Sequence, residues 1–295
     1  MHCKSFAALF SLLLFTPLFA QKVEPTYKQV AYGPHQDMVL NFWKIDSKKP
    51  TPLLVHIHGG GWLGGKKNET TSPNQMRNGY SYASIDYRLA GTELLPAAVH
   101  DAARAIQFLR TKAEEWNIDP KRIAVTGGSA GAASSMWLAY HDDLADPKSK
   151  DPVLRQSSRV CGAIAMGGQT TLDPFLLEKK IGPACIRHPM IWKTVGAESH
   201  EHLMKDWNKY KALSLECSPL THVTEDDPPV WIRYGKPAPV PVIKGDGIHH
   251  AGFGRLLKEK CTKVGIPCHL SVTENEQAEL KSADFLKKVF GQSKQ

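Results

Sequence analysis

The stretch "RIAVTGGSAGA", Arg122 to Ala132, decides the fold. It begins as an apolar strand, passes through two glycines and Ser129, and continues into "AGAASSMWLAY", which is typical of a helix. A sharp strand-to-helix turn puts a serine into strained backbone geometry at a helix N-terminus, and flanking glycines avoid the clashes that side chains would cause there. The pattern Gly127-x-Ser129-x-Gly131 therefore predicts a nucleophilic serine. The alternative is a glycine-rich turn whose serine only caps the helix.

Strand-like and helical segments alternate along the rest of the chain. The expected strands cover residues 26–33, 37–45, 52–58, 80–87, 122–128, 160–168, 229–235 and 266–272. The first two alternate like a hairpin, and helical segments separate the later ones, which predicts an α/β fold with a doubly wound, mostly parallel eight-stranded sheet. Residues 21–295 are expected to form a single domain. Residues 169–228 are too many for a simple crossover, so we expect a crossover helix and a cap between the sixth and seventh strands.

Composition and charge limit the possible partners and location. The 295 residues carry a net charge of +8, but the basic residues are scattered, which argues against a nucleic-acid partner. Lys4 and the apolar run "FAALFSLLLFTPLFA" indicate a signal peptide over residues 1–20. We therefore expect a secreted or periplasmic protein that has no membrane segment after cleavage.

A second glycine motif, "HGGGW", follows the strand expected over residues 52–58. Bare glycine backbone can bring N–H groups close to a substrate carbonyl. The amides of Gly60, Gly61 and Ala130 are expected to form an oxyanion hole, in which each donor contributes roughly 3 kcal/mol to transition-state stabilisation. His58 directly precedes the glycines, and this position suits a structural role in holding the loop.

Four blocks together resemble a known family. They are "HGGGW", "IDYRL" (Ile85 to Leu89), "LPAAVHDAARAIQFLR" (Leu95 to Arg110) and "TGGSAGA" (Thr126 to Ala132). In order and spacing they are similar to the α/β-hydrolase superfamily, in its esterase/lipase branch near hormone-sensitive-lipase-like and bacterial feruloyl-esterase-like enzymes. The resemblance implies hydrolysis of carboxylic esters through an acyl-serine intermediate. It also implies that Asp101 is a structural helix residue.

The chain departs from this family where the acid and the histidine are expected. The family order is serine, then an acid after the seventh strand, then a histidine after the eighth. Here "KPAPVP" follows the seventh strand, and residues 270–295 contain no histidine. The triad is therefore either rearranged or lost.

The stretch "DGIHH", Asp246 to His250, is the natural replacement, because it follows the seventh strand on the catalytic edge of the sheet. Either His249 or His250 could be the base, and His250 is slightly favoured because it lies nearer a helix expected to begin at about Ala251, whose dipole would keep it neutral. Asp246 could orient that base, and Asp173, after the sixth strand, is a second candidate acid. The structural alternative for the two histidines is a helix cap and a packed loop residue.

Two functional interpretations remain open from the residues alone. The first is a secreted serine hydrolase that cleaves small acyl or carbohydrate-linked esters. The second is a catalytically impaired binding protein that keeps the fold without a complete triad. Neither interpretation calls for a metal or an organic cofactor, since no C-x-x-C or His/Cys spacing indicates a zinc site.

Overall fold

The computed structural model describes residues 22–236, 241, 243–272 and 278–291. The signal peptide expected over residues 1–20 lies outside this range. None of the helices in the described part of the chain combines the length and the apolar character that a membrane span requires.

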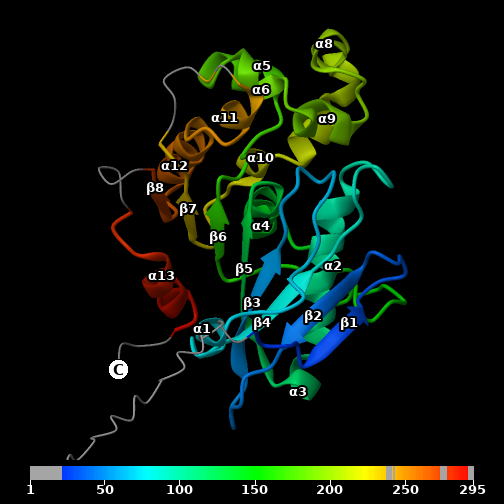
Figure 1. Ribbon diagram of the computed structural model, residues 1–295, viewed down its shortest axis with the longest axis vertical. Helices are drawn as coiled ribbons and strands as arrows, with labels where there is room; N and C mark the ends of the chain where they lie inside the picture. The colour runs from blue at the N-terminus through cyan, green and yellow to red at the C-terminus, as the bar shows by residue number, and fades with distance from the viewer. Residues whose placement is uncertain (1–21, 237–240, 242, 273–277, 292–295) are drawn as a thin grey trace, which may run out of the picture.

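One eight-stranded sheet forms the centre of the molecule (Figure 1). Its strands are β1 (Tyr27–Ala31), β2 (Val39–Trp43), β3 (Thr51–Ile57), β4 (Ser81–Ile85), β5 (Ile118–Gly128), β6 (Ala163–Met166), β7 (Val230–Arg233) and β8 (Cys268–Ser271). The spatial order is β1-β2-β4-β3-β5-β6-β7-β8. The pairs β1–β2 and β2–β4 are antiparallel, and all other pairs are parallel. The predicted fold class is confirmed.

Both faces of the sheet are buried. Leu53 and Val55 belong to the larger hydrophobic cluster of the core, whereas Leu54, between them in the chain, belongs to a smaller one. Successive strand residues point to opposite faces, so the two clusters lie on the two sides of the sheet. Phe285 of the last helix packs in the smaller cluster. Burial on both sides explains why β3 reads as a continuous apolar run rather than as an alternating one.

Helices connect the strands and cover the sheet. They are α1 (Pro73–Met76), α2 (Ala97–Thr111), α3 (Ala113–Trp116), α4 (Ala130–Tyr140), α5 (Pro174–Lys180), α6 (Pro183–Ile186), α7 (Pro189–Trp192), the 3₁₀ helix η1 (Lys193–Val195), α8 (His200–Lys205), α9 (Trp207–Glu216), α10 (Pro219–His222), α11 (Lys244–Ile248), α12 (Gly252–Val264) and α13 (Ser282–Val289).

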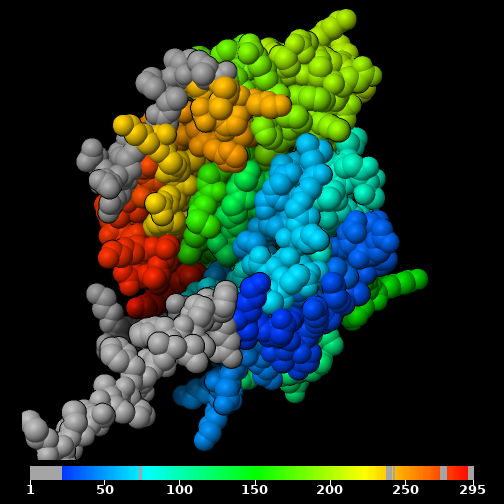
Figure 2. Space-filling model, viewed as in Figure 1, coloured from blue at the N-terminus to red at the C-terminus, as the bar shows by residue number. Residues whose placement is uncertain are grey.

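The segment from α5 to α10 lies between β6 and β7 in the chain, where the cap insertion is predicted. Its outer helices, α5, α6, α8 and α9, stand at the top of the view in Figure 1, beyond the carboxyl ends of the parallel strands. Ligand sites in doubly wound sheets lie at these strand ends. In the space-filling view, the orange segment that contains α11 packs directly against the green cap (Figure 2).

Candidate active site

Ser129 occupies the turn between β5 and α4. Its backbone has φ 53° and ψ −122°, a conformation that residues with a Cβ rarely adopt. The Ser129 N–H donates a 2.9 Å hydrogen bond to the carbonyl oxygen of Met166, the last residue of β6. The Ser129 side chain makes no capping hydrogen bond to α4. The alternative of a simple helix-capping serine is therefore wrong, and the strain is of the kind that concentrates at functional sites.

The backbone of the Ser129 turn packs directly against the backbone of the glycine loop after β3. A Cβ at Gly131 would lie 2.6 Å from the carbonyl oxygen of His58 and closer still to that of Ile57. A Cβ at Gly59 would lie 2.7 Å from the carbonyl oxygen of Gly128 and 3.4 Å from the Ser129 Cβ. The glycine motif after β3 and the turn after β5 therefore touch, although about 70 residues separate them in the sequence.

The glycine loop offers amide donors beside Ser129. Gly60 and Gly61 have φ values of 107° and 66°, and a residue with a side chain would be strained in either conformation. In the part of the chain that the structure describes, the N–H groups of Gly60, Gly61 and Ala130 donate no hydrogen bond. Unpaired, fixed N–H donors are suited to a negative charge that develops on a substrate oxygen.

His58 fixes the glycine loop through hydrogen bonds and ring stacking. Its Nδ1 donates a 2.8 Å hydrogen bond to the carbonyl of Gly59, and its own carbonyl accepts a 2.8 Å hydrogen bond from the Tyr87 hydroxyl. The two rings stack with centroids 4.2 Å apart. Burial lowers the pKa of the His58 imidazole, which keeps the ring neutral. These contacts agree with the structural role expected for His58.

His249 lies against the nucleophile. Its Nε2 is 3.0 Å from the Ser129 Oγ, and its Nδ1 is 3.2 Å from the carbonyl oxygen of Gly245. A carbonyl can only accept a hydrogen bond, so Nδ1 carries the proton and Nε2 presents its lone pair to the serine hydroxyl. This is the tautomer that a general base requires.

The segment that carries His249 is held by the end of β6 and by the cap. The buried Gln169 donates through Nε2 to the carbonyls of Gly167, at 3.2 Å, and Ile248, at 2.6 Å. On the cap side, a Cβ at Gly247 would lie 2.6 Å from the backbone nitrogen of Cys185 in α6. The position of His249 therefore depends on contacts from two other segments of the chain.

The slight preference for His250 is wrong on this geometry. A helix does begin near Ala251, as expected, because α12 starts at Gly252 with Ala251 as its N-cap residue. An additional short helix, α11, precedes it, and His249, the C-terminal cap residue of α11, is the histidine that reaches the serine. His250 is only 8% exposed, and its Nδ1 accepts a 3.0 Å hydrogen bond from the Gly252 N–H. It belongs to the packed turn between α11 and α12.

Neither candidate acid contacts His249. Asp173 is the N-cap of α5, where its carboxylate accepts hydrogen bonds from Phe175 and Leu176 at 2.9 and 3.1 Å. Asp246 is exposed and makes no hydrogen bond or ion pair within the described residues. The expectation that one of these carboxylates orients the base is not supported, because the Gly245 carbonyl occupies that place.

Asp101 is buried and forms a two-point ion pair with Arg88. The distances are 2.6 Å from Oδ1 to Nη2 and 2.9 Å from Oδ2 to Nε. This arrangement agrees with the structural role that the family resemblance implies.

His188 of the cap also approaches the site. Its Nδ1 accepts a 3.2 Å hydrogen bond from the Met190 N–H, and its Cε1 would be 3.9 Å from a Cβ at Gly61. Burial lowers the pKa of His188, and the neighbouring His249 and Lys244 lower it further. A neutral ring whose Nδ1 accepts must carry its proton on Nε2. No local sequence signal distinguishes His188 from the other cap histidines.

Comparisons with known proteins identify the family of this chain. The BD-FAE family model matches residues 42–246, which include the glycine loop and Ser129 but end before His249. The chain is 27% identical over 203 residues to "Probable carboxylic ester hydrolase LipM" of Mycobacterium tuberculosis, covering 67% of this chain and 44% of that protein. It spans about half or less of the length of the curated relatives it matches first.

Two solved structures share the fold. A truncated carbohydrate esterase from gut microbiota has a TM-score of 0.70 and 19% identity, with 90% of this chain and 96% of that chain covered. The acetyl ester-xyloside bifunctional hydrolase of Caldicellulosiruptor lactoaceticus has a TM-score of 0.62 and 21% identity, with 86% and 85% covered. Since the family model covers more than half of the sequence, this chain belongs to the BD-FAE family, in the esterase/lipase branch of the α/β hydrolases.

Proposed function

We propose that this protein is an exported serine esterase that cleaves carboxylic esters through an acyl-serine intermediate. The observation that carries the proposal is the 3.0 Å separation between His249 Nε2 and Ser129 Oγ, on a strained turn beside unpaired amide donors. A nucleophile, a base with the required tautomer and a cluster of N–H groups are the parts that acyl transfer needs.

The proposed reaction runs in two steps. His249 Nε2 takes the Ser129 proton as Oγ attacks the ester carbonyl, and the amides of Gly60, Gly61 and Ala130 stabilise the tetrahedral oxyanion. The His249 imidazolium then donates its proton to the alcohol as the alcohol leaves. In the second step, water attacks the acyl-serine by the same route and releases the acid. The Gly245 carbonyl stabilises the imidazolium through Nδ1–H in place of a carboxylate.

The substrates that we propose are small acyl or carbohydrate-linked esters. The family match supports an ester, and two neighbours in fold carry names that refer to carbohydrate or acetyl-ester substrates. Acetylated xylo-oligosaccharides and p-nitrophenyl acetate are therefore the substrates to compare first. A kcat/KM for the sugar esters far below that for p-nitrophenyl acetate would argue against the carbohydrate part of the proposal.

We also propose that the protein is exported, on the strength of the apolar N-terminal run over residues 6–20. The mass of the protein recovered outside the cytoplasm tests this part separately. We expect it to lack the first 20 residues, and a full-length chain that stays in the cytoplasm would contradict it.

Ser129→Ala provides the decisive test of activity. With p-nitrophenyl acetate we expect the wild-type protein to give an acylation burst and the variant to lose at least about 10⁴-fold in kcat. A fluorophosphonate probe should label the wild-type protein and leave Ser129→Ala unlabelled. The exposed Ser47→Ala is a matched control that should keep both properties. A folded wild-type protein that takes no label would favour the alternative of a catalytically impaired binding protein.

A further inference from the structure

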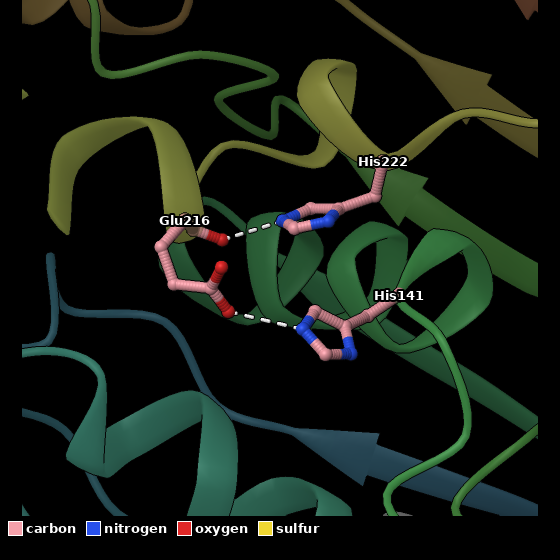
Figure 3. Close-up of side chains that lie close together, drawn as sticks. All are labelled: His141, Glu216 and His222. Atoms are coloured by element: carbon pink, nitrogen blue, oxygen red, sulfur yellow. Dashed lines mark hydrogen bonds and ion pairs between the residues drawn. The ribbon is translucent and has the colours of Figure 1, made fainter. Parts of the chain in front are cut away.

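Three side chains outside the active site meet at the junction of the nucleophile helix and the cap (Figure 3). His141 is the C-terminal cap residue of α4, Glu216 is the last residue of α9, and His222 is the last residue of α10. One possible ligand atom from each lies within 4.8 Å of the other two. We propose that His141, Glu216 and His222 form a binding site for a divalent transition metal, with zinc as the best match.

The hydrogen bonds of the two imidazoles prepare them as ligands. His141 Nδ1 faces the carbonyl of Asp142 at 2.9 Å, and His222 Nε2 faces the carbonyl of Glu216 at 2.6 Å. Because a carbonyl only accepts, both nitrogens carry protons, which leaves His141 Nε2 and His222 Nδ1 as the lone-pair atoms of the neutral rings. Metal-binding histidines characteristically donate their other N–H to a backbone carbonyl or a carboxylate in this way.

The contact between His141 and Glu216 calls for a positive charge. His141 Nε2 lies 3.0 Å from Glu216 Oε1, so a nitrogen lone pair would face an anionic oxygen unless a cation lies between them. Either a second proton on His141 or a metal ion can supply that charge. The His222 ring, whose centroid lies 4.6 Å from that of His141, provides a further nitrogen for the metal. As a neutral ring, it does not itself supply the positive charge.

The dimensions and chemistry are those of a zinc site. Two imidazoles and one carboxylate are a common protein ligand set for zinc, with water in the fourth position. Tetrahedral zinc with bonds of about 2.0–2.1 Å spaces its ligand atoms roughly 3.3 Å apart. Since the three residues bring ligand atoms within 4.8 Å of one another, side-chain rotations that shorten these distances would complete the site. All three residues are half-buried, and the Glu216 side chain is 39% exposed, which gives the ion a path from solvent.

The surroundings fix the position of the proposed ligands. Trp137 Nε1 donates a 2.8 Å hydrogen bond to the same Glu216 carbonyl that His222 contacts. The Trp137 ring also packs against both imidazoles. The site lies at the opposite end of α4 from Ser129, roughly 17 Å along an eleven-residue helix. The bound metal would therefore join the cap to the nucleophile helix and take no part in ester chemistry.

The test uses the full chain, produced without a polyhistidine tag and treated with a chelator. Zinc is titrated calorimetrically, and cobalt is added separately to record its visible absorption. We expect one zinc ion per chain, a rise in the thermal unfolding midpoint with zinc, and cobalt bands of a four-coordinate site. His141→Gln and His222→Gln should each lower zinc affinity by at least the roughly 10–100-fold that follows loss of an outer-shell partner.

Two further variants keep the result clear. Glu216→Gln retains the size and much of the hydrogen bonding of the side chain but removes its charge, so it should fold and bind zinc weakly. His202→Gln removes a different cap histidine, which lies 3.2 Å from Asp206, and should bind zinc as the wild-type protein does. The proposal is overturned if the wild-type protein binds no zinc, or if Glu216→Gln and His222→Gln bind it as tightly as His202→Gln. The cluster would then be a hydrogen-bonded junction that relies on a proton.

Discussion

The nucleophile turn and the base segment are built in different ways. Ser129 is held by main chain against main chain, where Gly59 and Gly131 leave no space for a side chain. His249 is held by a five-residue helix, by the side chain of Gln169 and by contact with the cap. The position of the nucleophile along the chain is therefore fixed by its surrounding backbone. The base can come from different segments, provided that one of its ring nitrogens reaches Ser129.

This contrast accounts for the departure from the family pattern. The strained turn depends on hydrogen bonds and packing among β3, β5 and β6, so a change in any of them displaces Ser129. The imidazole can be presented by any segment that reaches the same edge of the sheet. Here that segment follows β7 rather than β8, and a backbone carbonyl orients the ring.

The largest expected effect tests which histidine is the base. His249→Ala should lower kcat for p-nitrophenyl acetate by at least about 10⁴-fold, since the proton of Ser129 then has no acceptor. His250→Gln can still accept from the Gly252 N–H and should lose less than about 10-fold. Steady-state kinetics of the two variants decide the question. Equal losses in both would contradict the assignment of His249.

The second prediction concerns the rigid side of the comparison. Gly131→Ala should lower the free energy of unfolding by about 3 kcal/mol, because the new Cβ meets the carbonyls of Ile57 and His58. Gly128→Ala is the matched control within the same turn, since its Cβ would be no closer than 3.9 Å to its neighbour, the Met166 carbonyl oxygen. We expect it to cost less than about 1 kcal/mol. Urea unfolding of both variants measures the difference, and similar losses would show that the turn is less tightly packed than described.

The third prediction probes the adjustable side. Gln169→Ala should lower kcat by about 10-fold with little change in KM, because His249 loses its link to the end of β6 while substrate contacts remain. Gln107 is an equally buried glutamine that donates to three backbone carbonyls away from the site. Gln107→Ala should cost similar stability, about 1–3 kcal/mol, yet leave kcat unchanged. A similar fall in kcat for both variants would show that Gln169 supports the fold in general and does not specifically position His249.

The smallest effects are expected at the two carboxylates. Asp246→Asn and Asp173→Asn should each change kcat by less than about 3-fold, whereas loss of a true triad aspartate costs about 10⁴-fold. Asp173→Asn should also keep most of the stability, since asparagine is a good helix N-cap. Initial rates across a range of pH measure both variants. A large fall in kcat for Asp246→Asn would show that a carboxylate orients His249 after all.

Much of the architecture could be predicted from local patterns. The eight strands, the cap between β6 and β7, and the buried face of α2 follow from apolar periodicity and from segment length. The turn at Ser129 could be predicted because its signature, Gly127-x-Ser129-x-Gly131 between an apolar strand and a helical run, lies within a few positions of the serine. The prediction failed at the helix boundary before His249, where the weak pattern of "KGDGI" gave no sign of α11.

The sequence by itself determined the sheet, the strained serine and the glycine loop, because each of these depends on residue types at short, fixed spacings. Only the tertiary structure decided which histidine meets Ser129 across 120 residues, and that a carbonyl rather than a carboxylate orients it. It also decided that His141, Glu216 and His222 meet at one junction. The physical reason is that such contacts are made between the ends of separate elements, where a shift of a single residue along a helix changes which side chain faces the site.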